Sequence, residues 1–342
     1  MSWENEREVL HQMECFGVQF RTGDLPLRID HPKRKGCGKG GKWWYWLRSF
    51  QLRNGRAYIV GVFGSYKTGE FDKVDWKAPE LSQEDRERFA SERRAAEERA
   101  AEERRKESEF AAAGARVQWL KGSTQGVSPY LRRKGVDGEA CRYLPDGSLL
   151  VPLLRYDFDR AHALRAVQRI YPGPRVHSAT GEALPEKTFT KGFDPTRCSV
   201  RLGVVQPGAV VMVCEGYATG LSLRMATDRR VPVYVALNAG NLASVVMMVR
   251  ELHPESPILI CADDDWRTVI RGEKTNVGRI KANECAKKFE NVHVIYPVFG
   301  PDRGEKDTDY NDLHARRGLS AVRTQLLRAL RWLDPEQWKR AA

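Results

Sequence analysis

Short apolar runs alternate with helix-like stretches through the C-terminal part of the chain. The runs have continuous Val, Ile and Leu character, which is typical of strands buried on both faces of a sheet. They are Val210–Val213, Val233–Leu237, Ile258–Cys261 and Val292–Tyr296. Helical patterns fill the intervals between them, at 218–227, 241–252 and 277–290. This alternation predicts an α/β fold, with a parallel sheet and helices packed on its faces.

Acidic residues follow two of these runs directly. Glu215 follows the first run, Asp263 and Asp265 follow the third, and Asp307 and Asp309 lie further downstream. Ligands of parallel sheets bind outside the carboxyl ends of the strands, so we expect these carboxylates to meet there. Neighbouring carboxylates repel one another, and Mg²⁺ prefers carboxylate oxygens and serves phosphate chemistry. The pattern therefore predicts a pair of Mg²⁺ ions, for which Mn²⁺ is a substitute.

The order of these acids resembles that of the Toprim domain, which is shared by DnaG-type primases, topoisomerases and some nucleases. The family pattern is Glu-Gly after the first strand, Asp-x-Asp after a later strand and a further acidic pair downstream. Here the three elements are Glu215-Gly216, Asp263-Asp264-Asp265 and Asp307-Thr308-Asp309. We expect the middle residue, Asp264, to point away and to contribute little.

A closer resemblance is to the primases of phages and conjugative plasmids. Their typical strings are E-G-x-A-T-G, S-A-G-N-L, A-D-x-D, G-x-x-K-A and D-x-N-D-L. The corresponding segments are Glu215–Gly220, Asn238–Leu242, Ala262–Asp265, Gly278–Ala282 and Asp309–Leu313, with Asn238 where Ser is usual. This resemblance implies a DNA-dependent RNA primase, a nucleotidyltransferase that makes short RNA primers on single-stranded DNA from ribonucleoside triphosphates.

The resemblance also implies roles for particular residues. Asp263, Asp265, Asp307 and Asp309 are expected to bind metal, and Glu215 either binds metal or acts as the general base. Contacts with the ribose, base or phosphates are expected from Asn238, Gly240, Asn241 and Lys281.

Residues 116–205 are expected to form an α+β subdomain beside the Toprim domain. Ser128–Val136 resembles the P-Y-L-x-R-K-G-V string of these primases, and Lys187–Gly192 resembles their K-R-F element. Strands are predicted at 148–154 and 163–170. The whole chain has a net charge of +12, which suits a polyanionic partner. The basic residues expected to hold the template or the triphosphate are Arg132, Lys134, Lys187 and Lys191.

Two further segments precede this catalytic core. Residues 1–80 read as a small β-rich domain with strands at 43–47 and 57–63. Its basic loop Lys33–Lys42 lies beside aromatic residues, which suits single-stranded DNA, although the tryptophans are equally consistent with a core. Residues 81–115 read as a charged helix that buries little surface and spans solvent between domains. The Toprim domain with C-terminal helices takes up residues 206–342.

The seven cysteines form no Cys-x-x-Cys pair, so we expect neither a zinc site nor a disulfide framework. No stretch approaches the length of a membrane span, and the first residues lack the pattern of a signal peptide. The sequence thus favours a protein of the cytoplasm, in a bacterial cell or a phage-infected host.

Two other functions remain open at this point. A Toprim nuclease would use the same acids to activate water, and a non-catalytic accessory protein would bind single-stranded DNA without turnover. A replicative helicase is expected on a separate chain, because few residues follow Leu330.

Overall fold

The computed structural model describes residues 3–66, 69–76, 83–270 and 273–338. The chain divides into two compact units, Met1–Arg105 and Lys106–Ala342, and the division falls inside the 38-residue helix α2 (Gln83–Leu120). The segments predicted as 116–205 and 206–342 therefore share one unit. Among the described helices, none is both long and apolar enough to cross a membrane.

The first unit is built on an antiparallel sheet with the strand order β1-β2-β3-β4, which confirms the predicted β-rich domain. Its strands are β1 (Lys35–Cys37), β2 (Trp43–Gln51), β3 (Ala57–Ser65) and β4 (Phe71–Lys73). The sequence did not predict helix α1 (Glu6–Cys15), which packs Val9 and Met13 against Leu47 and Ile59 of one sheet face.

The first part of α2 packs against the opposite face of this sheet. The ring of Phe89 lies 4.6 Å from that of Phe50, and Ala96 and Ala100 are only 2% and 7% exposed. Most of α2 is exposed, but the contacts of these three residues with the sheet were not predicted. Alanine has a small side chain, so this part of α2 buries residues without the large apolar side chains that the sequence pattern would have shown.

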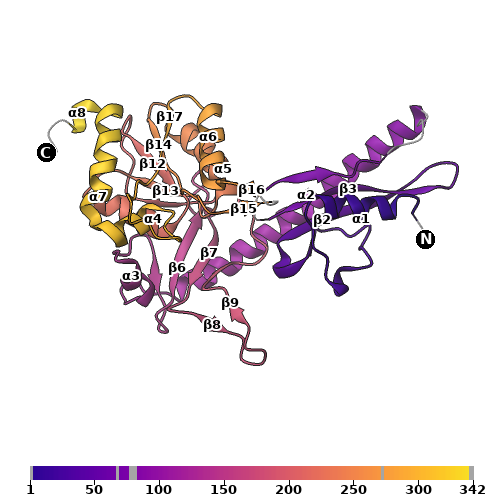
Figure 1. Cartoon of the computed structure of the whole chain (residues 1–342), viewed down its shortest axis with the longest axis horizontal. Helices are drawn as coiled ribbons and strands as arrows, with labels where there is room; N and C mark the ends of the chain where they lie inside the picture. The colour runs from indigo at the N-terminus through magenta and orange to yellow at the C-terminus, as the bar shows by residue number, and fades with distance from the viewer. Residues whose placement is uncertain (1–2, 67–68, 77–82, 271–272, 339–342) are drawn as a thin grey trace. The chain divides into compact units, whose positions relative to one another are not determined.

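The second unit contains two sheets, and the first is antiparallel with the order β10-β7-β6-β5. Helix α3 (Pro129–Lys134) precedes this sheet, and a hairpin of β8 (Arg175–Val176) and β9 (Ala183–Leu184) projects beyond it (Figure 1). The two long strands confirm those predicted at 148–154 and 163–170. The four strands are β5 (Arg142–Tyr143), β6 (Leu149–Leu154), β7 (Leu164–Ile170) and β10 (Lys187–Phe189).

The second sheet is the predicted parallel one, in the order β11-β13-β12-β14-β17. Only its edge strand β11 runs antiparallel to its neighbour. The strands are β11 (Val200–Leu202), β12 (Val211–Cys214), β13 (Val233–Val235), β14 (Ile258–Cys261) and β17 (Val292–Ile295). A short hairpin of β15 (Val269–Ile270) and β16 (Glu273–Lys274) follows β14.

Helices cover both faces of this parallel sheet (Figure 1). Met212 and Cys214 face one core, with α4 and α7, while Val211 and Val213 face the other, with α5 and α6. This burial on both faces explains why the strands read as continuous apolar runs. The helices are α4 (Tyr217–Ala226), α5 (Leu242–Leu252), α6 (Val277–Lys288), α7 (Tyr310–Leu333) and the short α8 (Pro335–Trp338).

Candidate active site

Three carboxylates from separate parts of the chain influence one another at the carboxyl edge of the parallel sheet. Glu215 connects β12 to α4, Asp263 follows β14, and Asp309 caps the N-terminus of α7. The carboxylate of Asp309 accepts a hydrogen bond from Thr219 Oγ1 of α4 at 3.0 Å, which ties the start of α7 to the helix that follows Glu215. The expected convergence of these acids therefore has a structural basis.

Burial and mutual repulsion raise the pKa values of all three groups. Loss of solvent raises the pKa of Glu215 to about 7, and the charges of Asp265 and Asp309 add to the effect. Burial, with the charges of Glu215 and Asp309, raises the pKa of Asp263 well above its usual value. The pKa of Asp309 is raised by burial and by Asp312. Negative charge is therefore concentrated here and is poorly compensated by the protein.

An oxygen of Asp263 shows where a cation would fit. Its Oδ1 is buried and has no hydrogen-bond partner within the described parts of the chain. Across those same residues, no group of three or more His, Cys, Asp or Glu side chains is arranged as a ready-made metal site. Mg²⁺ usually keeps several waters and binds through one or two carboxylates, so the residues present fit this ion without a full protein cage.

The side chain of Asp265 contacts the N-terminus of α6. Its Oδ2 accepts a hydrogen bond from the backbone N–H of Gly278 at 3.2 Å, and its own N–H donates to Asn276 Oδ1 at 3.0 Å. A β-carbon at Gly278 would collide with the backbone carbonyl oxygen of Asp263. The glycine therefore allows α6 to begin directly against the acidic loop, with its N-terminal backbone turned towards the carboxylate of Asp265.

Asp264 has a larger structural role than the sequence analysis expected. It is 3% exposed, and its carboxylate pairs with Arg303 and Arg279, both at 2.7 Å, and accepts from Asn276 at 2.6 Å. Its pKa is lowered because hydrogen bonds from these three residues outweigh the effect of burial. The expectation that Asp264 contributes little is wrong, because it anchors the loop that carries Asp263 and Asp265.

The structure does not bring Asp307 into the group with raised pKa values. Its carboxylate pairs with Arg316 and accepts from the backbone N–H of Gly304 at 2.7 Å. The hydrogen bond with Arg316 holds its pKa below the usual value. Asp312 completes a capping box with Asp309 at the start of α7. To bind metal, Asp307 would have to exchange its arginine partner.

Two of the predicted basic residues lie near the acidic residues. One is on helix α3 and the other is on strand β10 of the antiparallel sheet. Lys134, at the end of α3, lies 3.8 Å from Asp312 and acts to lower the pKa of Asp309. Lys187, on β10, has its Nζ 5.4 Å from the ring centre of Tyr130. The pKa of Lys187 is lowered because surrounding atoms desolvate it and Lys134 repels it, while Asp309 and Asp263 act in the opposite direction.

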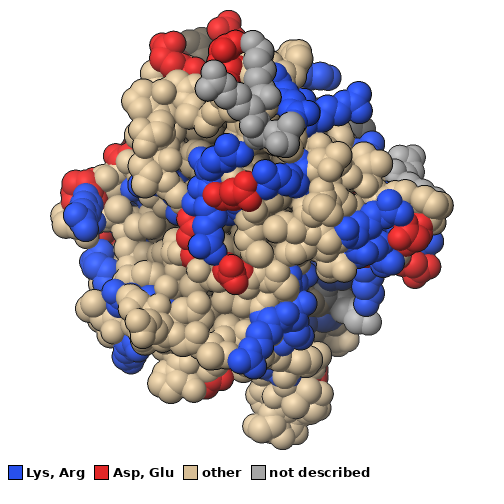
Figure 2. Space-filling view, turned by 90° about the vertical axis from the view of Figure 1, so that its left-hand side faces the viewer, with Lys and Arg blue, Asp and Glu red and all other residues tan. Residues whose placement is uncertain are grey.

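The other predicted basic residues lie elsewhere. Arg132 and Lys191 have exposed side chains, and Lys281 pairs with Glu284 of its own helix at 3.2 Å. On the face of the molecule in Figure 2, Lys and Arg side chains lie around and between acidic ones. A template contact by these three residues stays a prediction.

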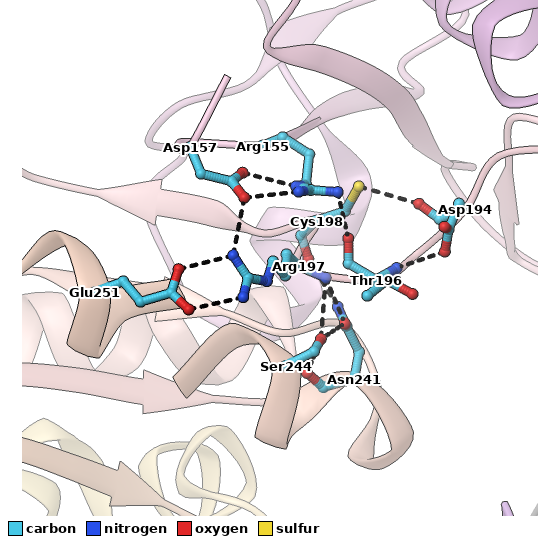
Figure 3. A network of polar contacts seen from close by, with 9 residues as sticks. All are labelled: Arg155, Asp157, Asp194, Thr196, Arg197, Cys198, Asn241, Ser244 and Glu251. Atoms are coloured by element: carbon cyan, nitrogen blue, oxygen red, sulfur yellow. Dashed lines mark hydrogen bonds and ion pairs between the residues drawn. The ribbon is translucent and has the colours of Figure 1, made fainter. Parts of the chain in front are cut away.

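Figure 3 shows a polar network that connects the segment before the parallel sheet to the turn after β13. At its centre, the guanidinium of Arg197 donates to Asp157 at 3.1 Å and to both oxygens of Glu251 at 2.8 Å. Its backbone N–H donates to Asn241 Oδ1 at 3.2 Å and to Ser244 Oγ at 3.0 Å. The sequence analysis missed Arg197, because a single arginine in a loop carries no distinguishing pattern.

Three of the predicted nucleotide contacts lie in the turn after β13, and they differ in exposure. Asn241 is buried, and its amide donates to the carbonyls of Cys198 at 2.8 Å and Ala236 at 3.0 Å. Asn238 and Gly240 are exposed, and Asn238 Oδ1 accepts from the N–H of Asn241 at 2.9 Å. Asn241 therefore shapes the turn from within, and the open positions are Asn238 and Gly240.

Comparison with known proteins identifies the class of this domain. Residues 210–320 match the family model described as the Toprim domain. The identification made from the acidic motifs is confirmed.

The chain as a whole is similar to DNA primase TraC of Escherichia coli. It is 26% identical to one such protein over 333 residues, which make up 92% of this chain and 29% of the relative. It is 24% identical to another over 305 residues, covering 87% of this chain and 20% of the relative. The chain spans less than a third of the length of these relatives. The predicted resemblance to plasmid primases is thereby confirmed.

Solved primase structures show more distant likenesses. The primase fragment of the bacteriophage T7 primase-helicase protein is 15% identical with a TM-score of 0.37, covering 60% of this chain and 73% of its own. The DnaG primase catalytic domain bound to single-stranded DNA is 13% identical with a TM-score of 0.38, covering 66% and 82%.

Proposed function

We propose that this chain is a DNA-dependent RNA primase, which joins ribonucleoside triphosphates into short RNA on a single-stranded DNA template. The observation that carries the proposal is that Lys134, which lies 3.8 Å from Asp312, and Lys187 are within electrostatic reach of the half-buried Asp263 and Asp309. Carboxylates that attract a divalent cation, next to amines that attract phosphates, suit a metal-bound nucleoside triphosphate. The similarity to DNA primase TraC supports the same reaction.

In each reaction step a bond forms between the 3′-oxygen of one nucleotide and the α-phosphorus of the next. The bond between the α- and β-phosphates breaks, pyrophosphate leaves, and the 3′-hydroxyl gives up its proton. Magnesium bound through one or two of the carboxylates of Asp263, Asp265 and Asp309 would make that hydroxyl more acidic and neutralise the triphosphate. Lys134 and Lys187 hold the phosphates. Glu215 either joins the metal ligands or receives the proton, and its pKa of about 7 suits proton transfer near neutral pH.

The partners that we propose follow from this reaction. They are the single-stranded DNA template, the ribonucleoside triphosphates and a replicative helicase, in the cytoplasm of a bacterial cell or a phage-infected host.

The direct test is incubation of the full chain with single-stranded DNA, Mg²⁺ and labelled ribonucleotides. We expect short RNA products from the wild type and none from Asp263→Asn, which keeps the side-chain shape but removes the charge. The matched control is Asp302→Asn, because Asp302 is an exposed aspartate paired with Arg317 on the surface. Wild-type synthesis by Asp263→Asn at limiting magnesium would remove Asp263 from the site.

The same assay separates the alternative functions. A Toprim nuclease would shorten end-labelled DNA and make no RNA, and this cleavage would also require Asp263. An accessory protein would bind the DNA and produce neither RNA nor cleaved DNA. Either result would replace the proposed reaction.

A further inference from the structure

A cavity of about 640 Å³ lies within the first unit, between the sheet and the first part of α2. Its sheet wall includes Trp46, Arg48 and Lys73, and its helix wall includes Phe89, Arg93 and Arg99. The sequence analysis pointed to the loop Lys33–Lys42 as the nucleic-acid contact and treated α2 as a spacer. The structure instead makes α2 one side of a partly open cavity whose lining includes aromatic and basic side chains.

Aromatic rings and arginines recur along the face of β2 that looks towards α2. Residues two apart on a strand share a face and lie about 6.6 Å apart, so Trp44, Trp46 and Phe50 form a row. Each ring has an arginine guanidinium over it. The pairs are Arg34 over Trp44 at 4.0 Å, Arg48 over Trp46 at 4.7 Å and Arg88 over Phe50 at 5.5 Å.

The row continues beyond the cavity, near Trp44. The ring of Tyr66 lies 6.2 Å from that of Trp44, and this tyrosine is 57% exposed. Arg34 over Trp44 is also within electrostatic reach of Arg104 of α2, and burial together with this repulsion lowers its pKa. The aromatic and basic surface is therefore longer than the cavity alone.

The acids of the cavity are already engaged inside the unit. Asp30 accepts hydrogen bonds from the backbone and hydroxyl of Ser49. Glu92 pairs with Arg88 at 3.8 Å, and Glu97 pairs with Arg93 at 3.7 Å.

Three cations of the cavity remain without such a partner. Among the described residues, no carboxylate lies within ion-pair distance of Arg48, Lys73 or Arg99. In addition, Arg48 Nε is buried and makes no hydrogen bond to any of those residues. Burial lowers the pKa of Arg48, Asp30 acts in the opposite direction, and Arg99 lowers it further. The cavity therefore offers cations to an anionic ligand. Trp44 and Phe50 are buried, so the ring surface open to such a ligand belongs to the half-buried Trp46 and the exposed Tyr66.

We propose that this groove binds a single-stranded polynucleotide, with bases stacked against Trp46 and Tyr66 and phosphates on Arg48, Lys73 and Arg99. This deepens the proposed function, because it rests on a single-stranded template and places part of it in the first unit. Stacking on aromatic side chains with cationic contacts to the backbone is how such strands are bound without sequence preference. A mononucleotide would fill the cavity and leave the outer part of the row unused, so the row favours a strand.

The test uses the full chain without magnesium and measures the anisotropy of a labelled oligothymidylate over a range of salt concentrations. For the double variant Arg48→Gln/Arg99→Gln we expect at least a tenfold weaker affinity. Each phosphate contact on a single strand contributes about 0.7 to the slope of log K against log salt, so the slope should fall by about 1.4. Trp46→Leu should weaken binding by about tenfold with the slope unchanged, because stacking releases no counterions.

The matched control is Arg56→Gln/Arg94→Gln. It removes the same charge from exposed positions of the same unit, one of them on α2, and neither residue lines the cavity. It should leave the slope and the affinity close to those of the wild type. If the two double variants lose affinity equally, the binding depends on overall charge and the proposal fails. It also fails if ATP competes as effectively as the oligonucleotide, since the site would then hold a mononucleotide.

The groove and the proposed reaction can fail separately. If Arg48→Gln/Arg99→Gln binds the oligonucleotide like the wild type while Asp263→Asn abolishes RNA synthesis, the reaction stands and the groove does not. If that double variant loses binding but the wild type joins no nucleotides, the groove stands and the primase proposal does not. Circular dichroism of each variant checks its fold. If Trp46→Leu unfolds, the double variant Arg48→Gln/Arg99→Gln still tests the groove.

Discussion

The apoprotein should become more stable at neutral and alkaline pH when Glu215 is replaced by glutamine. Because the folded-state pKa of Glu215 is raised from 4.5 to about 7, its favourable state is the protonated one. The contribution of protonated Glu215 to the free energy of unfolding is therefore fully present below about pH 4.5, and it is lost as the pH rises through about 7. At about 1.4 kcal/mol for each pKa unit, the loss amounts to about 3 kcal/mol. Glu215→Gln removes the charge and keeps a side chain of the same shape.

The measurement is the free energy of unfolding of the full chain by urea, in the presence of EDTA, from pH 5 to 8.5. The difference between Glu215→Gln and wild type should be small at pH 5 and approach about 3 kcal/mol in favour of the variant at pH 8.5. Added Mg²⁺ should stabilise the wild type more than the variant, because it binds the ionised cluster.

The control for this prediction is Glu284→Gln, an exposed glutamate on α6 paired with Lys281. It should produce no gain that grows with pH. If the difference in unfolding free energy between Glu215→Gln and wild type is the same at pH 5 and pH 8.5, the argument that burial and neighbouring charges raise this pKa is refuted. A variant that is less stable at pH 8.5 would show that the carboxylate is stabilised by contacts in the folded chain.

Two further predictions concern the framework around the site. Asp264→Ala should lower the free energy of unfolding by about 3–5 kcal/mol, measured by urea denaturation, because it leaves the half-buried Arg303 without its carboxylate; a loss below 1 kcal/mol would contradict this role. A fragment that begins at Lys106 should be at least about 2 kcal/mol more stable than one that begins at residue 116, because Glu109 pairs with the buried Arg165 and Ala115 packs with Leu150 and Val167. Equal unfolding midpoints for the two fragments would show that this end of α2 is dispensable.

The parallel sheet could be predicted because its signal is local. Every strand predicted between 209 and 296 exists within two residues of its expected bounds, since strands buried on both faces leave uninterrupted apolar runs. Helix α1 and the packing of α2 escaped prediction because their signals are weak. The buried face of α2 uses alanines such as Ala96 and Ala100, which look the same in a solvent-exposed helix. The cavity beside them depends on how a helix and a sheet are spaced, and no short motif encodes that spacing.

Within the candidate site, the motifs located the acids but did not distinguish their environments. Asp264 and Asp307 have arginine partners that lower their pKa values, so they stabilise the loops that carry them. Glu215 and Asp263 lack such partners and have raised pKa values. These contrasts depend on Arg303 and Arg316, which lie outside the motifs, and on Arg279, which occupies an unspecified position of the G-x-x-K-A string.

This division of the acids explains how a repulsive cluster persists in a folded chain. The free energy lost by burying Glu215 and Asp263 has to be offset close by, or the loops would move apart and release the charge to water. Asp264 fixes one loop through two arginines, and the capping box of Asp309 and Asp312 fixes the start of α7. Asp309 takes part in both roles, since it caps a helix and shares the repulsion. The cluster is therefore held in a state that a divalent cation would relieve, which is the property that metal-dependent phosphate chemistry requires.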